Sequence, residues 1–203
     1  MVTVNLGLLA NHLVLQWCLI EVSTLFIAPL VARGELTHPR ATAWRYLLYS
    51  AMSLGLTFIG FLALAQSGHL RGVEPSFMVD ALGASLTTNP DAWQRLGLSF
   101  ILFGLGSKLG LAPLYGWLPE TYEGAPTSTS ALLASVQFNV SMVAVFRILQ
   151  ICRGTVVGFV SQELLVMGYL SLVVATIQIF VYPDAYALHG TWAQLDDAAG
   201  RRE

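Results

Sequence analysis

The chain has 203 residues, of which 55% are hydrophobic and only 11% are charged, whereas a typical soluble domain carries about 25% charged residues. Its formal net charge is −2, which excludes the strongly basic face that nucleic-acid-binding proteins present. This composition predicts an all-α polytopic membrane protein that is embedded in a lipid bilayer.

Five apolar segments are each close to the 20 or so residues that a helix needs to cross a bilayer. We expect these segments to form one transmembrane helical domain over residues 1–186, followed by a polar tail at residues 187–203. A short interfacial helix is predicted near residues 77–86, between the second and third segments. The predicted spans are residues 6–32, 43–66, 96–114, 128–150 and 155–182.

An odd number of spans places the two termini on opposite sides of the membrane. Arginines are slightly more numerous on the side of the first connection and the C-terminus, and cytoplasmic loops are enriched in positive charge. We therefore expect a bacterial inner-membrane protein with its N-terminus outside and its C-terminus in the cytoplasm. The arginines on the predicted cytoplasmic side are Arg33, Arg40, Arg45, Arg201 and Arg202.

Lys108 is the only lysine of the chain, and it lies within the third predicted span. A lysine at the bilayer centre costs about 2.5 to 3.5 kcal/mol on insertion scales. Arginine stays protonated inside proteins, whereas a buried lysine can release its proton. The position therefore predicts a protonatable side chain that takes part in a proton path.

Glu21 lies near the middle of the first span, at a depth similar to that of Lys108 on another helix. Two opposite charges at this depth can pair, and the balance between them can shift when a proton arrives. The alternative is a buried ion pair that only fixes the packing of the helices. The two residues alone leave both interpretations open.

The helix that carries Lys108 is predicted to be discontinuous, because Gly106 and Gly110 flank the lysine and Pro113 lacks a backbone donor. An interrupted helix is tolerated within a membrane only where its freed backbone groups face protein or water. The pattern indicates a hydrated cavity beside the lysine. Close packing of helices at the glycines is the alternative.

Polar side chains continue along the fourth span, where Ser128, Ser135 and Asn139 share one helical face by their spacing. They are candidates to hold water between Lys108 and the next helix, or to form hydrogen bonds between helices. The sequence shows no nucleophile with a base, no phosphate-binding loop and no cofactor motif. Neither Cys18, Cys152 nor the histidines have metal-ligand spacing, so we expect no metal, no cofactor and no catalytic site.

Two adjacent motifs resemble a known family. The segments GSKLG (106–110) and APLYGWLPETYEGAPTSTSALL (112–133) are similar to the signature of antiporter-like proton-translocating membrane subunits. Such subunits occur in respiratory complex I, in formate-hydrogenlyase-type hydrogenases and in multisubunit cation/proton antiporters. LVLQWCLIEVSTL (13–25) resembles the family's fifth helix, and AWRYLLYSAMSLGL (43–56) resembles the sixth. The likeness is greatest to the hydrogenase-type branch, in which lysine usually stands at the position of Arg45.

The resemblance implies that the five spans correspond to helices five to nine of the antiporter-like fold. It also implies that Glu21 and Lys108 pair inside the membrane as a proton-relay element, with Arg45, Ser135 and Asn139 as supporting polar residues. The expected partners are other membrane subunits of a multisubunit complex.

The chain also departs from the family pattern. Family members have about fourteen helices in two inverted repeats, whereas five are predicted here. Tyr115 and Tyr122 replace histidines of the signature, Ala134 stands where some members have another histidine, and residues 181–190 lack the usual lysine and arginine. Three hypotheses remain: a truncated subunit with a partial proton path, a degenerate non-pumping structural or assembly subunit of a respiratory or photosynthetic complex, and a gene fragment or split member of a bicarbonate- or cation-transport system.

Overall fold

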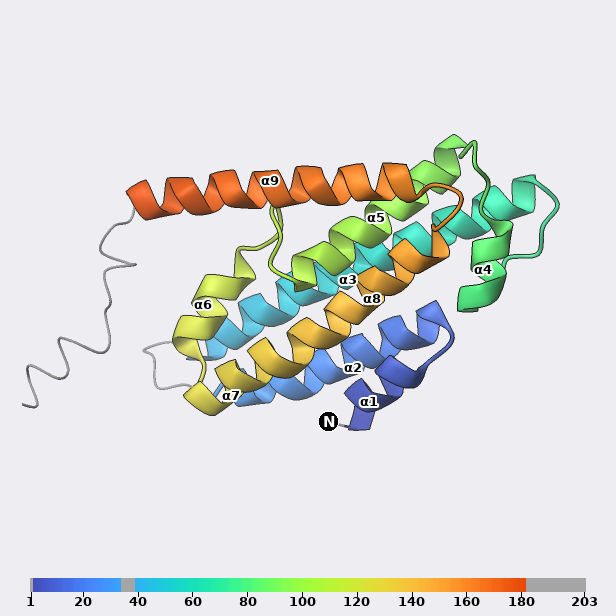
Figure 1. The fold of residues 1–203 in the computed structure, drawn as a ribbon. Helices are drawn as coiled ribbons and strands as arrows, with labels where there is room; N and C mark the ends of the chain where they lie inside the picture. The colour runs from blue at the N-terminus through green and yellow to red at the C-terminus, as the bar shows by residue number, and fades with distance from the viewer. Residues whose placement is uncertain (1, 34–38, 182–203) are drawn as a thin grey trace, which may run out of the picture.

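The computed structural model describes residues 2–33 and 39–181, and over this part of the chain it is a bundle of helices (Figure 1). The all-α fold predicted from composition is confirmed. The predicted polar tail at residues 187–203 lies outside the described residues.

Along the chain, short helices lie between several of the long ones. Four stretches among the described residues are long and apolar enough to cross a membrane: Leu13–Val31, Arg40–Leu70, Thr127–Ile151 and Val157–Phe180. The helix that carries the lysine is a shorter one of 17 residues. The elements are α1 (Val2–Leu9), α2 (Leu13–Val31), α3 (Pro39–Leu70), α4 (Val79–Ser85), α5 (Ala92–Lys108), α6 (Trp117–Gly124), α7 (Thr127–Leu132), the π-helical turn η1 (Leu133–Gln137), α8 (Phe138–Ile151) and α9 (Val157–Val181).

The first predicted span is not one helix. The chain turns at residues 10–12, and α1 packs against α2 as a hairpin (Figure 1). His12 caps α2 by accepting a hydrogen bond from the Leu15 amide at 3.3 Å. The Asn11 carbonyl accepts a hydrogen bond from the Val79 amide at 3.2 Å, so the turn is also held by α4. A residue such as His12, whose side chain accepts a hydrogen bond from the first turn of a helix, favours a helix start over a helix interior. This is why the chain breaks here.

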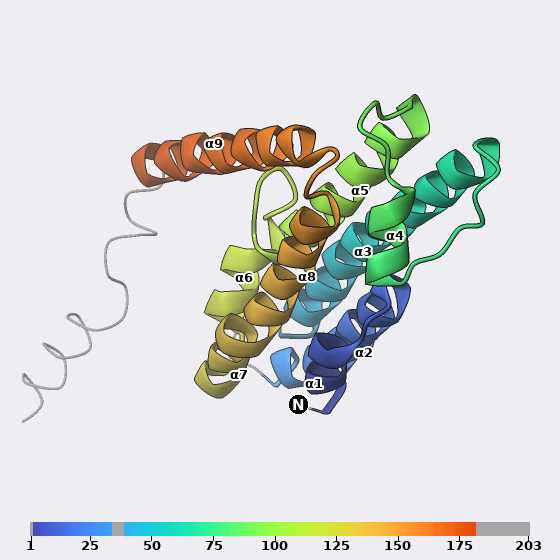
Figure 2. The same ribbon diagram turned by 45° about the vertical axis from the view of Figure 1, so that its right-hand side comes forward.

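α3 and α5 form the most extensive helix pair of the bundle and lie side by side in both views (Figures 1 and 2). Glycines permit their close approach: a Cβ at Gly60 would lie 2.6 Å from the Gly97 carbonyl oxygen. Leu98, Ile101 and Leu102 are buried along α5. The backbone that leads to Lys108 is therefore packed rigidly against α3.

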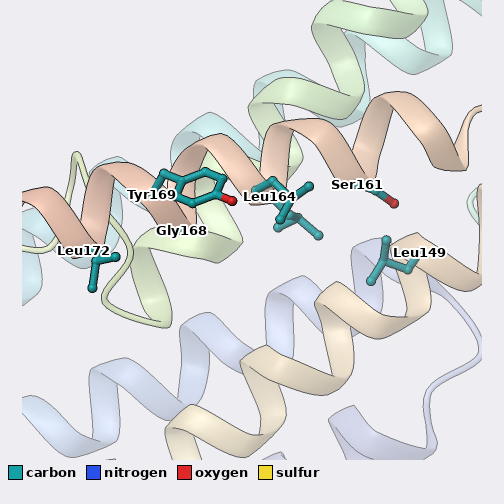
Figure 3. Close-up of a pocket in the computed structure, with 7 residues that line it drawn as sticks. Leu149, Ser161, Leu164, Gly168, Tyr169 and Leu172 are labelled. Atoms are coloured by element: carbon teal, nitrogen blue, oxygen red, sulfur yellow. The ribbon is translucent and has the colours of Figure 1, made fainter.

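α9 stands apart from this bundle (Figure 2). Most of its side chains are exposed, including Leu165, Val173 and Phe180. It diverges from α8 across an open groove of about 620 Å³, whose walls include Leu149 on α8 and Leu164 on α9 (Figure 3). This groove is mainly apolar, and Lys108 is not among its lining residues.

Candidate functional site

Lys108 is the last residue of α5, and its side chain is buried, with 2% of its surface exposed. The ammonium Nζ donates hydrogen bonds to Thr24 Oγ1 on α2 at 2.9 Å and to Ser50 Oγ on α3 at 2.7 Å. It lies 5.9 Å from the centre of the Tyr46 ring. Three helices thus meet at the lysine, and its direct hydrogen-bond partners are hydroxyl groups.

Glu21 is half-buried on α2, one turn before Thr24, and acts electrostatically on Lys108. The expected direct ion pair is not present: among the described residues, the one ion pair within 4.0 Å joins Arg45 to Glu120. The buried Glu21 Oε2 atom has no hydrogen-bond partner. The carboxylate therefore contributes a field at the lysine and no direct contact.

The predicted interruption of the lysine helix is confirmed. The chain leaves α5 directly after Lys108 and turns at Gly110, which has a φ of 77°, a left-handed conformation that glycine adopts without strain. The Gly106 carbonyl accepts hydrogen bonds from the Leu109 and Leu111 amides at 3.0 and 2.9 Å. Protein groups thus satisfy the freed backbone, as a break at membrane depth requires.

Two neighbouring helices hold the chain on both sides of the break in place. On α6, Trp117 Nε1 donates to the Ser107 carbonyl oxygen at 2.9 Å. On α9, Ser171 Oγ accepts from the Ala112 amide at 2.8 Å, and Gln178 Nε2 donates to the Tyr115 hydroxyl at 2.8 Å. A pocket of about 380 Å³ lies between this segment and α9. The break is therefore an ordered element that touches α9 and the lysine helix together.

Arg45, predicted as a supporting residue, lies away from the lysine. Its guanidinium forms a bidentate pair with Glu120 on α6, at 2.8 and 2.9 Å. The side chains of Arg45 and Glu120 are 59% and 47% exposed. The pair joins α3 to α6 at the surface, one residue from the buried Tyr46.

Ser135 and Asn139 share a face with Ser128 as predicted, but all three are exposed. Their side chains bond to the backbone of their own helix: Ser135 donates to the Ala131 carbonyl, and Asn139 to the Ser135 carbonyl. Helical spacing shows which residues share a face, but not which face points inward. The hydrogen bonds of Ser135 and Asn139 therefore reach neither Lys108 nor another helix within the described residues.

The inward face of the fourth span belongs to Gln137 and Ser141, which are 1% and 0% exposed. Gln137 ends the π-helical turn η1 and accepts a hydrogen bond from Ser23 Oγ on α2 at 2.9 Å. Such turns insert an extra residue into a helix and shift the residues that follow around its axis. Ser23 is next to Thr24, so this contact adjoins the lysine site.

Sequence reasoning missed the hydroxyls that hold the lysine. A usable signal existed on α3, where Ser50, Ser53 and Thr57 follow one another at a spacing of three and four residues within an apolar span. All three are buried, and Ser53 Oγ lies 2.6 Å from Ser107 Oγ on α5. Among the described residues, no group of three or more His, Cys, Asp or Glu side chains is placed to hold a metal ion.

Comparison with known proteins agrees with this architecture. Residues 10–181 match the family model described as "NADH:quinone oxidoreductase/Mrp antiporter, TM". The chain belongs to this family. A hydrogenase-4 component F homolog from Methylacidiphilum infernorum is 31% identical over 152 residues, which are 70% of this chain and 30% of that protein. NADH-quinone oxidoreductase subunit N of Nitrosospira multiformis is 32% identical over 130 residues, which are 63% of this chain and 25% of that protein.

The structure has the same fold as part of respiratory complex I from Thermus thermophilus, with a TM-score of 0.60 and 22% identity over 71% of this chain and 31% of the matched one. The chain therefore spans about a third or less of the length of these antiporter-like relatives. The predicted likeness to antiporter-like subunits of the complex I and hydrogenase type is confirmed, and the family with its apolar helices shows an integral membrane protein.

Proposed function

We propose that this chain is a membrane subunit of a larger energy-converting complex and carries part of a proton path through Lys108, with Glu21 as the charge that tunes it. The observation that carries the proposal is the set of direct partners of Lys108. A hydroxyl can both donate and accept hydrogen bonds, so Thr24 and Ser50 can hold the ammonium and the neutral amine alike.

A carboxylate in direct contact would instead hold the ammonium in its charged form. Glu21 acts on the lysine from beyond ion-pair distance, so its attraction is weaker than that of a contact pair. A proton can therefore leave Lys108 without breaking a contact ion pair. These features favour a residue that changes protonation over one that only locks the helices together.

The test compares three substitutions of Lys108 in the assembled complex, with proton translocation measured in sealed vesicles by a pH-sensitive dye. Lys108→Ala removes the exchangeable proton, and Lys108→Arg keeps a permanent charge that cannot be released. Both are expected to abolish translocation through this subunit while the complex still assembles. Lys108→Met, which has a similar length and no charge, is expected to behave like Lys108→Ala.

Glu21→Gln keeps the shape of the side chain and removes its charge. We expect a reduced rate of translocation, since the field that stabilises the charged lysine is lost. Translocation at the wild-type rate in the Lys108→Arg variant would show that release of a proton from this residue is not required.

A second candidate function is that of a structural or assembly subunit that does not conduct protons. It is supported by Tyr115 and Tyr122, which stand where the resembling signature has histidines. Burial raises the pKa of the Tyr122 hydroxyl, so this side chain keeps its proton near neutral pH, where a histidine would exchange one. In this case the Lys108 and Glu21 variants change only the stability of the complex, and translocation per assembled complex stays the same.

A further inference from the structure

A row of buried polar side chains leads away from Lys108 toward the α1–α2 turn. We call Ser50, Ser53, Thr57 and Gln16 the polar track; each is at most 2% exposed. Ser50 bonds to the lysine, and Ser53 lies one turn further along α3 beside Ser107. Thr57 follows after about 6 Å of helix. The track thus runs from the lysine toward the end of the bundle at which α2 begins and α3 and α8 end (Figure 1).

Thr57 on α3 and Gln16 on α2 meet at a small internal cavity. The cavity has a volume of about 10 Å³, and these two residues supply hydrogen-bonding side chains among its largely apolar walls. The buried Gln16 Nε2 atom has no hydrogen-bond partner in the protein. A volume of this size accommodates about one water molecule. The cavity therefore offers a polar step between the serines near Lys108 and the side chain of Gln16.

Arg147 occupies the far end of the track. Its guanidinium donates to Gln16 Oε1 at 3.0 Å and to the backbone carbonyls of Leu8 and Ala10 at the α1–α2 turn. No carboxylate of residues 2–33 and 39–181 lies within ion-pair distance of it. Carbonyls at the end of α1 carry only a partial negative charge, so they neutralise little of the positive charge of the half-buried Arg147 guanidinium.

We propose that Arg147 is an electrostatic barrier that closes the α1–α2 end of the polar track to protons, so that Lys108 exchanges protons through the α6 end only. The inference rests on the proposed function. Arginine remains protonated in proteins and therefore cannot pass a proton onward. A fixed positive charge in a narrow passage repels protons and cations, which is how several membrane pores exclude them.

The test is passive proton leak in sealed vesicles that contain the assembled complex, measured after a pH jump without any driving reaction. Arg147→Gln removes the charge, and Arg147→Lys keeps the charge while losing the fork of hydrogen bonds. We expect the leak to rise about tenfold in Arg147→Gln, the factor that a unit charge acting at about 10 Å in an effective dielectric of about 20 corresponds to. Arg147→Lys is expected to leak like the wild type.

The exposed Arg153 lies in the turn after α8 and provides a matched control: Arg153→Gln removes an arginine near the same end and should leave the leak unchanged. Gln16→Glu gives a second route to the same question, because a carboxylate beside Arg147 would neutralise the barrier while the arginine stays in place. Its leak should also rise, and this variant decides the matter if Arg147→Gln does not assemble.

Equal leaks in Arg147→Gln and Arg147→Lys would show that the packing of the side chain matters and its charge does not, which overturns the proposal. An unchanged leak in both Arg147→Gln and Gln16→Glu would overturn it as well. Failure of the proposed function would show in a different measurement, as driven translocation that persists in the Lys108→Arg variant. If the proposed function and the Arg147 barrier both hold, adding Lys108→Ala to Arg147→Gln should bring the leak back to the wild-type level.

Discussion

Two arginines lie at opposite ends of the bundle, Arg45 near the start of α3 and Arg147 near the end of α8, and their charges are partnered in opposite ways. Arg45 is exposed and neutralised by a bidentate contact with Glu120 on α6. Arg147 is half-buried, bonded to carbonyl oxygens and an amide, and has no carboxylate partner among the described residues. We infer that the pairing of these charges, and not their number, sets the end from which Lys108 exchanges protons.

The largest expected effect on stability comes from placing a larger side chain against the polar track. A Cβ at Gly104 would overlap Thr57 Oγ1 and the Ser53 carbonyl oxygen, and the backbone atom cannot move aside. We expect Gly104→Ala to destabilise the protein by about 3 kcal/mol, the upper range for overpacking. The thermal midpoint in detergent measures this. Gly55→Ala on α3 is the matched control, because a Cβ there meets no atom within 4 Å; a similar loss in both variants would contradict the close packing described here.

Removal of the Arg147 side chain is expected to have the next largest effect on stability. Arg147→Ala leaves the Leu8 and Ala10 carbonyls and Gln16 Oε1 without their donor. Loss of hydrogen bonds to a charged group costs about 1.5 to 3 kcal/mol. The same thermal unfolding measurement checks this value, with Arg153→Ala as the control at an exposed site. A change no larger than that of the control would show that Arg147 does not fasten the α1–α2 turn to α8.

Loss of the Ser23–Gln137 contact should be smaller. Ser23→Ala removes the hydroxyl that donates to Gln137 Oε1 and leaves a buried acceptor unpaired. We expect a loss of about 1 to 2 kcal/mol together with a change in translocation, since the contact adjoins Thr24. Ser135→Ala, at an exposed position on the span that carries Gln137, is the control, and it should change the stability of this chain very little. An equal effect of the two changes would argue against the inward orientation of Gln137.

The smallest expected effect is at the exposed pair. A double-mutant cycle with Arg45→Gln and Glu120→Gln should give a coupling energy close to zero, because solvent and salt screen exposed ions. The coupling should fall further at high ionic strength. A large coupling energy that does not respond to salt would mean that the pair is shielded from solvent in the complex, and that the two arginines are less different than this chain indicates.

Much of the fold followed from the sequence, since long apolar runs in a polytopic chain predict its helices. The site followed only in part. Lys108 and the break after it were predictable, because a charged residue is unusual within an apolar segment and because the glycines on both sides of it weaken a helix. The chain turn at residues 10–12 was not predicted, because the run from Leu6 to Ala32 is apolar enough to read as one helix. The inward face of the fourth span depends on the π-helical turn at residues 133–137. This turn rotates the residues that follow it about the helix axis, and nothing in the amino-acid composition marks its position.

The partners of Lys108 show the same limit. Thr24 and Ser50 come from two helices separated widely in sequence from the lysine. Hydroxyl residues in membrane helices can bond to another helix or to the backbone of their own helix, as Thr176 does. Which hydroxyls turn to a lysine depends on how three helices pack. The expectation of a direct Glu21 contact failed for this reason, because depth in the membrane predicts proximity but not the partner that is reached.

The most direct test of the account is the side from which the lysine site can be reached. Ser50→Cys places a thiol at the position that bonds Lys108, in a background where Cys18 and Cys152 are replaced by alanine. Membrane-impermeant thiol reagents are then added to one face at a time of vesicles that contain the assembled complex. We expect modification from the face on which α6 lies and none from the face of the α1–α2 turn. Modification from the turn face, or from neither face, would contradict a lysine that exchanges protons through the α6 end.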